Sequence, residues 1–137
     1  VQTSTLSWTP VWVSLPIAIL VAAILSANNL RDIKDDTSAG FSTLASKLGW
    51  NSFATFYRVM LVSAYIVLIA LVVLKIAPIW ALITLLSVPP LLKLFKTVGE
   101  ASPSSPSSLA MIDISTAQLH FLFGLLLTIS FILSKFI

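Results

Sequence analysis

Four stretches of this chain are apolar over about twenty residues each, the length that a helix needs to cross the roughly 30 Å core of a bilayer. Backbone polar groups in lipid must pair within their own segment, so each stretch is expected to be a helix. The sequence therefore predicts an all-α integral membrane protein with about four transmembrane helices, in one membrane domain covering 1–137. The expected spans are about 10–29, 53–74, 76–95 and 117–136.

Composition supports this class and excludes others. Hydrophobic residues make up 58% of the chain and charged residues only 9%, whereas soluble domains carry roughly 25% charged residues. The chain has no cysteine, which excludes disulfides and thiolate metal sites. Its net charge of +3 is spread out rather than clustered, so no nucleic-acid partner is expected. The chain begins with Val1, which suggests a fragment or a processed chain.

The distribution of basic residues predicts an orientation. With four spans, the loops at 31–52 and 93–116 share one side of the membrane. That side and the helix ends beside it hold six basic residues: Arg31, Lys34, Lys47, Arg58, Lys93 and Lys96. The other side holds only Lys75 and Lys135. Because cytoplasmic loops are enriched in Lys and Arg, we expect the aspartate-rich loop to face the cytoplasm of a cell with this protein in its plasma membrane.

Prolines occur within or at the start of several apolar stretches. Pro78 stands where a helix can begin, since its missing N–H costs nothing there. Pro16 and the pair Pro89 and Pro90 fall inside apolar runs, and a proline there predicts a kink or an early helix end.

The first apolar stretch ends in a cluster of carboxylates. Asn28, Asp32 and Asp36 are spaced four residues apart, so on a helix they line one face, while Asp35 points elsewhere. Oxygen ligands of this kind suit Mg²⁺, which takes one or two carboxylates and completes its shell with water and substrate phosphates. Arg31 and Lys34 are placed to meet phosphate oxygens. The competing interpretation is a solvated loop whose acids balance nearby basic residues.

The residues around this cluster favour the metal site. "NNLRDIKDDTSAGFSTLASKLG" at 28–49 resembles the second aspartate-rich motif of the UbiA superfamily of intramembrane prenyltransferases. It is most similar to the branch that prenylates 1,4-dihydroxy-2-naphthoate in menaquinone synthesis. "PVWVSLPIAILVAAIL" at 10–25 resembles the helix leading into that motif, and "STAQLHFLFGLLLTISFIL" at 115–133 resembles the branch's final helix. The resemblance covers nearly the whole chain.

This resemblance implies a fold and a chemistry. The family fold is a nine-helix bundle, of which this chain would supply the last four helices. Two aspartate-rich motifs, one from each half, bind the diphosphate of a polyprenyl donor through Mg²⁺. Asp32 and Asp36 match the catalytic, metal-binding aspartates of the second motif, and Asn28 and Arg31 match diphosphate-binding positions beside them. In the naphthoate branch a polyprenyl chain joins the ring, and diphosphate and carbon dioxide are released.

Two departures from the family pattern qualify these implications. Phe41 stands where the family usually has a basic residue after the glycine, and Lys47 is the nearest downstream substitute for a diphosphate contact. Nothing in the chain resembles the first aspartate-rich motif. We therefore expect this fragment to be inactive alone, with the missing N-terminal half supplied in the same polypeptide or as a separate chain.

Several alternatives stay open at this stage. The acceptor could instead be 4-hydroxybenzoate, homogentisate, a haem or chlorophyll ring, or a glycerol-phosphate lipid. The chain could be a non-catalytic membrane subunit that binds quinone or lipid in a larger complex. A transporter fragment ranks last, because Asp32 and Asp36 fall at the end of a span rather than at its midplane.

Other single residues receive plainer interpretations. His120 and Arg58 are read mainly as interfacial side chains, and Tyr57 and Tyr65 as packing residues. Asp113 is read as a loop charge.

Overall fold

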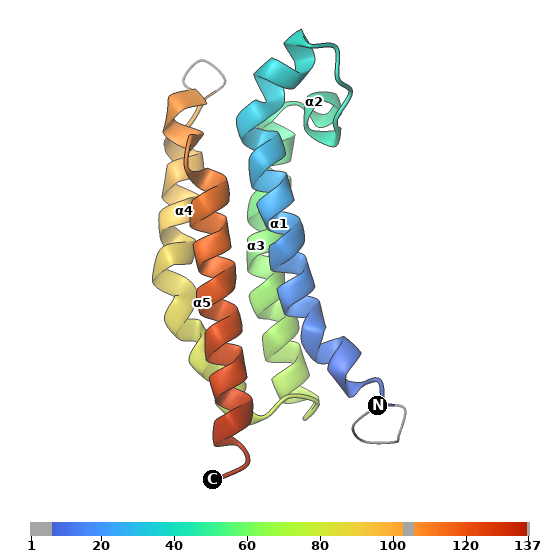
Figure 1. The fold of residues 1–137 in the computed structure, drawn as a ribbon, viewed down its shortest axis with the longest axis vertical. Helices are drawn as coiled ribbons and strands as arrows, with labels where there is room; N and C mark the ends of the chain where they lie inside the picture. Colours follow the sequence, from blue (N-terminus) through green and yellow to red (C-terminus); the bar gives the residue numbers. More distant parts are fainter. Residues whose placement is uncertain (1–6, 103–105, 137) are drawn as a thin grey trace.

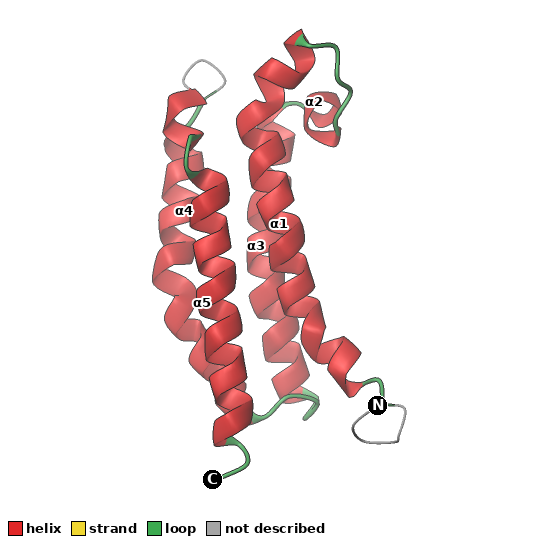
Figure 2. Cartoon of the chain, viewed as in Figure 1, coloured by secondary structure: helices red, strands yellow, loops and turns green. Residues whose placement is uncertain are grey.

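The chain folds into a bundle of long helices joined by short connections (Figure 1). The computed structural model describes residues 7–102 and 106–136, and these contain no β-strand (Figure 2). The elements are α1 (Thr9–Ser38), α2 (Leu44–Leu48), α3 (Trp50–Val73), the 3₁₀ helix η1 (Ile79–Ser87), α4 (Val88–Glu100), the 3₁₀ turn η2 (Pro106–Leu109) and α5 (Ile112–Leu133).

The expected number of spans is confirmed. Within the described residues, four helical segments are long and apolar enough to cross a membrane: Thr9–Ser38, Trp50–Val73, Ile79–Glu100 and Ile112–Leu133. The chain is therefore an all-α integral membrane protein. Two boundaries differ from the sequence expectation in a way that matters for function, because α1 continues nine residues beyond 29 and α5 begins five residues before 117.

The bundle is organised around α1 and α5. Helix α1 packs against both α3 and α5, and η1 and α4 pack against α5. In Figure 1, α1 and α5 lie in front of α3 and α4. Leu20, Leu61, Leu68, Leu119 and Phe123 are fully buried between these helices. Many large apolar side chains remain exposed on the outer surfaces, as expected of helices that meet lipid or further helices.

The prolines in the first and third spans have different effects on their helices. Helix α1 runs through Pro16 without ending, so an early helix end there is wrong, and the kink given as its alternative stays a prediction. At Pro89 and Pro90 the sequence predicts a kink or an early helix end, and the structure has a change of helix type instead: the third span is a 3₁₀ helix up to Ser87 and an α-helix from Val88. The two prolines occupy the start of α4, where a missing N–H breaks no intrahelical hydrogen bond.

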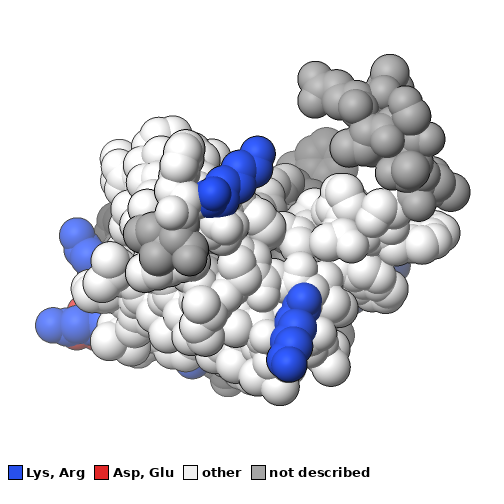
Figure 3. Space-filling model, turned by 90° about the horizontal axis from the view of Figure 1, so that it is seen from below, with Lys and Arg blue, Asp and Glu red and all other residues white. Residues whose placement is uncertain are grey.

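The two ends of the bundle differ in charge. The connection at 39–49, the end of α4 and the start of α5 lie at one end of the bundle, as the four-span topology predicts, and the start of α1 and the end of α5 lie at the other (Figure 1). Figure 3 shows the latter end, which is mostly uncharged apart from a few basic side chains. Its described basic residues by sequence position are Lys75, between α3 and η1, and Lys135, after α5. The carboxylate cluster therefore lies at the more highly charged end.

Candidate functional site

The candidate site is built on the last three turns of α1. Because α1 stays helical to Ser38, Asn28, Asp32 and Asp36 keep their four-residue spacing on a regular helix and lie along one face. Asp32 and Asp36 are half-buried, whereas Asp35 is exposed. The helix register expected from the sequence is therefore the register that the structure has.

A glycine ends α1 one turn after Asp36. Gly40 has a φ of +80°, a left-handed conformation that favours glycine. The N–H of Phe41 donates to the carbonyl of Asp36 at 2.8 Å, and the N–H of Gly40 to that of Thr37 at 3.2 Å. This pair of reversed hydrogen bonds is a Schellman motif. It satisfies the last carbonyls of α1 and turns the chain toward α2.

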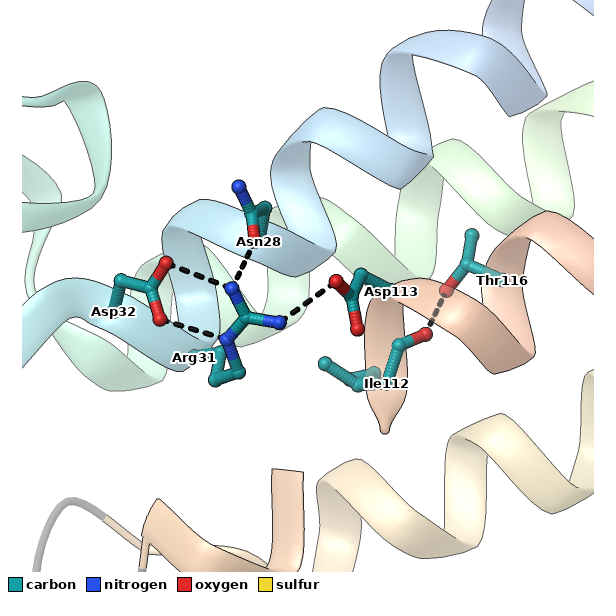
Figure 4. Close-up of polar contacts among 6 residues, drawn as sticks. All are labelled: Asn28, Arg31, Asp32, Ile112, Asp113 and Thr116. Atoms are coloured by element: carbon teal, nitrogen blue, oxygen red, sulfur yellow. Dashed lines mark hydrogen bonds and ion pairs between the residues drawn. The ribbon is translucent and has the colours of Figure 1, made fainter. Parts of the chain in front are cut away.

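Arg31 is the centre of the polar contacts in the site (Figure 4). Its Nε donates to Oδ1 of Asp32 at 2.7 Å, and its Nη2 donates to Oδ2 of Asp32 at 3.0 Å. Nη2 also donates to Oδ1 of Asn28. Two-pronged contacts between a guanidinium and a carboxylate fix orientation as well as distance. Arg31 therefore orients the side chains of Asn28 and Asp32 on their common face.

A third acceptor comes from another helix. Nη1 of Arg31 donates to Oδ2 of Asp113 at 2.7 Å, and Asp113 lies in the first turn of α5. The interpretation of Asp113 as a loop charge is wrong, because α5 begins before it. A carboxylate in the first helical turn is favoured by the helix dipole. An aspartate just before an apolar span is the signal that sequence reasoning had available and did not use.

The predicted lysines lie apart from this cluster. Lys34 is exposed and follows Asp32 by two positions, so the helix turns it by about 200° away from that carboxylate. Lys47 is exposed on α2, whose N-terminus is capped by a reciprocal pair of hydrogen bonds between Thr43 and Ser46. No contact of either lysine with Asp32 occurs in the described part of the chain. Their roles stay predictions.

Arg58 also lies elsewhere. Its Nη2 would be 3.5 Å from a Cβ placed on Gly99, so it belongs to the contact between α3 and the end of α4. Its side chain makes no recorded contact with the Arg31 cluster within the described residues.

An apolar groove runs down the bundle between α1 and α5. Its upper part has a volume of about 440 Å³ and its lower part about 430 Å³, and both are lined by Ile17 of α1 and Leu127 of α5. Ile17 precedes Asn28 by eleven residues, about three full turns, so both lie on the same side of α1. His120 and Gly124 also line the groove, and they follow Asp113 by seven and eleven residues on one side of α5. Asn28 and Asp113 therefore lie on the same side of the α1–α5 pair as the groove, farther along the two helices.

Neutral hydrogen bonds lie beneath the charged cluster. The hydroxyl groups of Tyr57 and Thr116 are 2.6 Å apart, and Thr116 also donates to the carbonyl of Ile112 at 2.6 Å. Tyr65 bonds Ser87 across the α3–η1 contact. Both tyrosines are buried, which agrees with the expectation that they pack within the bundle.

The donor set of this chain fits part of a magnesium site. Asp32 and Asp36 supply two carboxylates one turn apart, and Mg²⁺ usually takes one or two from a protein. In the described residues no third acidic, histidine or cysteine side chain joins them in a group that could hold a metal alone. The remaining ligands of such a site would have to be substrate oxygens, water or residues outside this chain.

The fold and the site together define a class of protein: a helical membrane protein with a carboxylate and guanidinium cluster at one end of its bundle. Residues 1–114 match the UbiA prenyltransferase family, and the chain belongs to that family. No solved structure matches it.

Curated relatives support the assignment. The chain is 35% identical over 136 residues to a 1,4-dihydroxy-2-naphthoate octaprenyltransferase of Bacillus subtilis (strain 168), covering 99% of this chain and 43% of that protein. It is 30% identical over 129 residues to a UbiA prenyltransferase domain-containing protein 1 homolog of Drosophila melanogaster, covering 94% of this chain and 34% of that protein. The chain thus spans less than half the length of these relatives.

Proposed function

We propose that this chain forms part of a Mg²⁺-dependent enzyme that transfers a polyprenyl group from polyprenyl diphosphate to an aromatic quinone precursor, most specifically 1,4-dihydroxy-2-naphthoate in menaquinone biosynthesis. The observation that carries the proposal is the cluster of Asp32, Asp36 and Arg31 at the charged end of an apolar helical bundle, whose α1–α5 face carries the apolar groove farther along the helices. A polyprenyl diphosphate has the matching character, with a strongly anionic head and a long hydrocarbon tail. The similarity to the Bacillus protein along 99% of the chain supports the choice of acceptor.

Different residues would contact the diphosphate head and the prenyl tail of the donor. Asp32 and Asp36 would hold Mg²⁺, which neutralises the leaving diphosphate and so favours cleavage of its bond to the prenyl carbon. Asn28, Arg31, Lys34 and Lys47 would contact the diphosphate, the two lysines from more exposed positions. The groove would receive the prenyl chain and exclude water, which would otherwise react with the allylic centre before the ring does.

The proposal includes the parts of the enzyme that this chain does not contain. The first aspartate-rich motif, from the N-terminal half in the same polypeptide or from a separate chain, would face Asp32 and Asp36 across the diphosphate. We therefore expect residues 1–137 alone to be inactive. We also infer that the charged end faces the cytoplasm from the plasma membrane, since six of the eight basic residues are assigned to that side.

The test begins with the natural polypeptide that contains these residues, purified in detergent. Its intact mass tells whether the two halves are one chain; a mass near 14.8 kDa would direct the search to a co-purifying partner. The purified enzyme or complex is then assayed with a polyprenyl diphosphate and Mg²⁺, offering dihydroxynaphthoate, 4-hydroxybenzoate and homogentisate in parallel. Mg²⁺-dependent prenylation of the naphthoate is the expected result. Turnover of only another acceptor would overturn the naphthoate assignment, and no prenylation of any acceptor would favour a non-catalytic subunit.

A further inference from the structure

We propose that Asp113 is a positioning residue for the diphosphate site: it holds Arg31 in place from the neighbouring helix, so that Arg31 can exchange its contacts with Asp32 and Asn28 for contacts with the donor. This inference rests on the proposed function and adds to it a residue outside the aspartate-rich motif.

The first observation is that most of the N–H donors of Arg31 already have acceptors. A guanidinium has five N–H donors. Four contacts are made here: two to Asp32, one to Asn28 and one to Asp113. At most one donor is left for a phosphate oxygen in this arrangement. Arg31 can therefore bind a diphosphate strongly only if it releases some of the contacts that it now makes.

The second observation is that these contacts are not equivalent. Asn28 and Asp32 stand on α1 with Arg31 itself, on the face proposed to receive the diphosphate. Asp113 stands on α5, reaches the guanidinium through Nη1 alone, and lies outside the aspartate-rich motif. When a diphosphate arrives, Nε and Nη2 can turn from the α1 side chains toward phosphate oxygens while Nη1 stays on Asp113. Asp113 is the one partner suited to hold Arg31 before and after binding.

The third observation is that Asp113 stands on a turn of α5 that is packed against its neighbours. It lies in the first turn of α5, and Thr116 in the next turn is bonded to the buried Tyr57 of α3 at 2.6 Å. The side chains of Arg31 and Asp113 are only 28% and 24% exposed. A partly buried ion pair between fixed helices is more defined in geometry than a fully exposed one, whose contribution is usually small. Figure 4 shows the guanidinium lying between Asp32 and Asp113.

A purely structural tether between α1 and α5 would show the same contact, so the test must separate the two roles. Binding of a non-reactive prenyl thiolodiphosphate to the complete enzyme, measured by calorimetry in detergent with Mg²⁺, reports on positioning without turnover. Thermal unfolding of the same samples reports on tethering. Asp113→Ala removes the acceptor, Asp113→Asn keeps an oxygen that accepts from Nη1, and Asp35→Ala removes a nearby exposed carboxylate as the matched control.

If Asp113 positions Arg31, Asp113→Ala raises the dissociation constant of the analogue about tenfold, the effect of losing one hydrogen bond to a charged group. Asp113→Asn has a smaller effect in the same direction, and Asp35→Ala has none. A lower unfolding temperature for both Asp113 variants with unchanged analogue binding would overturn the inference in favour of a tether. Because Asp113→Asn alters no side-chain volume, it keeps the test valid even where Asp113→Ala fails to fold.

A double-mutant cycle tests whether Asp113 acts through Arg31. Arg31→Lys places a point charge that lacks the planar fork, so it cannot keep one contact while exchanging the others. In that background Asp113→Asn should change the dissociation constant of the analogue by less than twofold. The effect of Asp113 on binding would then depend on the presence of Arg31. Equal effects in both backgrounds would show that Asp113 acts on its own. If the unmodified enzyme bound no prenyl diphosphate, the proposed function itself would fail, which is a different result from normal binding that is insensitive to Asp113.

Discussion

Two polar contacts between helices differ in their charge and in their number of partners. Arg31 joins α1 to α5 at the charged end, through a partly buried ion pair of 2.7 Å that shares its guanidinium with Asp32 and Asn28. Tyr65 joins α3 to η1 in the interior, through a neutral hydroxyl pair of 2.7 Å, with the tyrosine only 5% exposed and its ring edge-on to Phe123. The first is charged and has several partners, and the second is neutral and local.

The difference follows from where each contact lies. In the apolar interior an unpaired polar group is costly, so a short neutral pair is satisfied once and stays so. At the wet end of the bundle water and ions can compete for every charged group, and a guanidinium with several acceptors can trade one for another. We infer that the interior contacts hold the bundle and the charged contacts serve binding. Four substitutions in the complete enzyme test this separation.

The largest effect is expected from Asp32→Ala. It removes both the proposed metal ligand and the two-pronged partner of Arg31, so we expect a loss of at least about a hundredfold in the rate of prenyl transfer, the scale seen when one charge-stabilising group is lost. The unfolding temperature should change little, since the contact lies on α1 alone and remains partly accessible to water. Initial rates with saturating Mg²⁺ measure this, and near-normal turnover would contradict the metal-ligand assignment.

Asp36→Ala should also reduce turnover strongly, by roughly tenfold to a hundredfold. It removes a proposed ligand but leaves Arg31 on Asp32, Asn28 and Asp113. Its loss should be partly compensated by raising the Mg²⁺ concentration, because a weakened metal site is filled by mass action. A Mg²⁺ titration of the variant checks this; a defect unaffected by Mg²⁺ would argue against ligation by Asp36.

Tyr57→Phe should affect stability and not chemistry. It deletes one of the two hydrogen bonds of Thr116 and leaves the one to Ile112, so the free energy of unfolding should fall by about 0.6 kcal/mol, the average for such bonds in membrane bundles. Thermal unfolding in detergent measures the change, with Thr55→Val on the exposed side of α3 as the control. A tenfold loss of activity at unchanged stability would mean that Tyr57 belongs to the site.

The smallest effect is expected from Asp35→Ala. Asp35 is exposed, and no hydrogen bond or ion pair joins its side chain to the Arg31 cluster in the described part of the chain, so its removal should change the rate by less than about twofold, as for most surface substitutions. Asp35 has the same charge as Asp32 and Asp36, so a difference among the three alanine variants reports on the position of the carboxylate and not on its charge. A loss equal to that of Asp36→Ala would mean that the helix register of the site is wrong.

Much of this architecture could be predicted from local sequence. Span length follows from the thickness of the bilayer, and helix register follows from 3.6 residues per turn, so the alignment of Asn28, Asp32 and Asp36 needed no tertiary information. A disturbance of the helix at Pro89 and Pro90 is expected from their missing donors, but as a kink or a helix end and not as the change from 3₁₀ to α geometry that occurs. Pro16 was harder, because a transmembrane helix tolerates a proline when neighbouring groups accommodate the freed carbonyl.

The contacts between residues of different helices were decided by the tertiary structure alone. That Asp113 reaches Arg31, that Tyr57 bonds Thr116, and that His120 and Ile17 line one groove all depend on how α1, α3 and α5 lie against one another. The sequence determined the lipid-spanning helices and the carboxylate face because both follow from periodicity within a segment. The partners of that face come from residues dozens of positions away, and only packing brings such residues within the 3 Å range where charges and hydroxyl groups recognise each other.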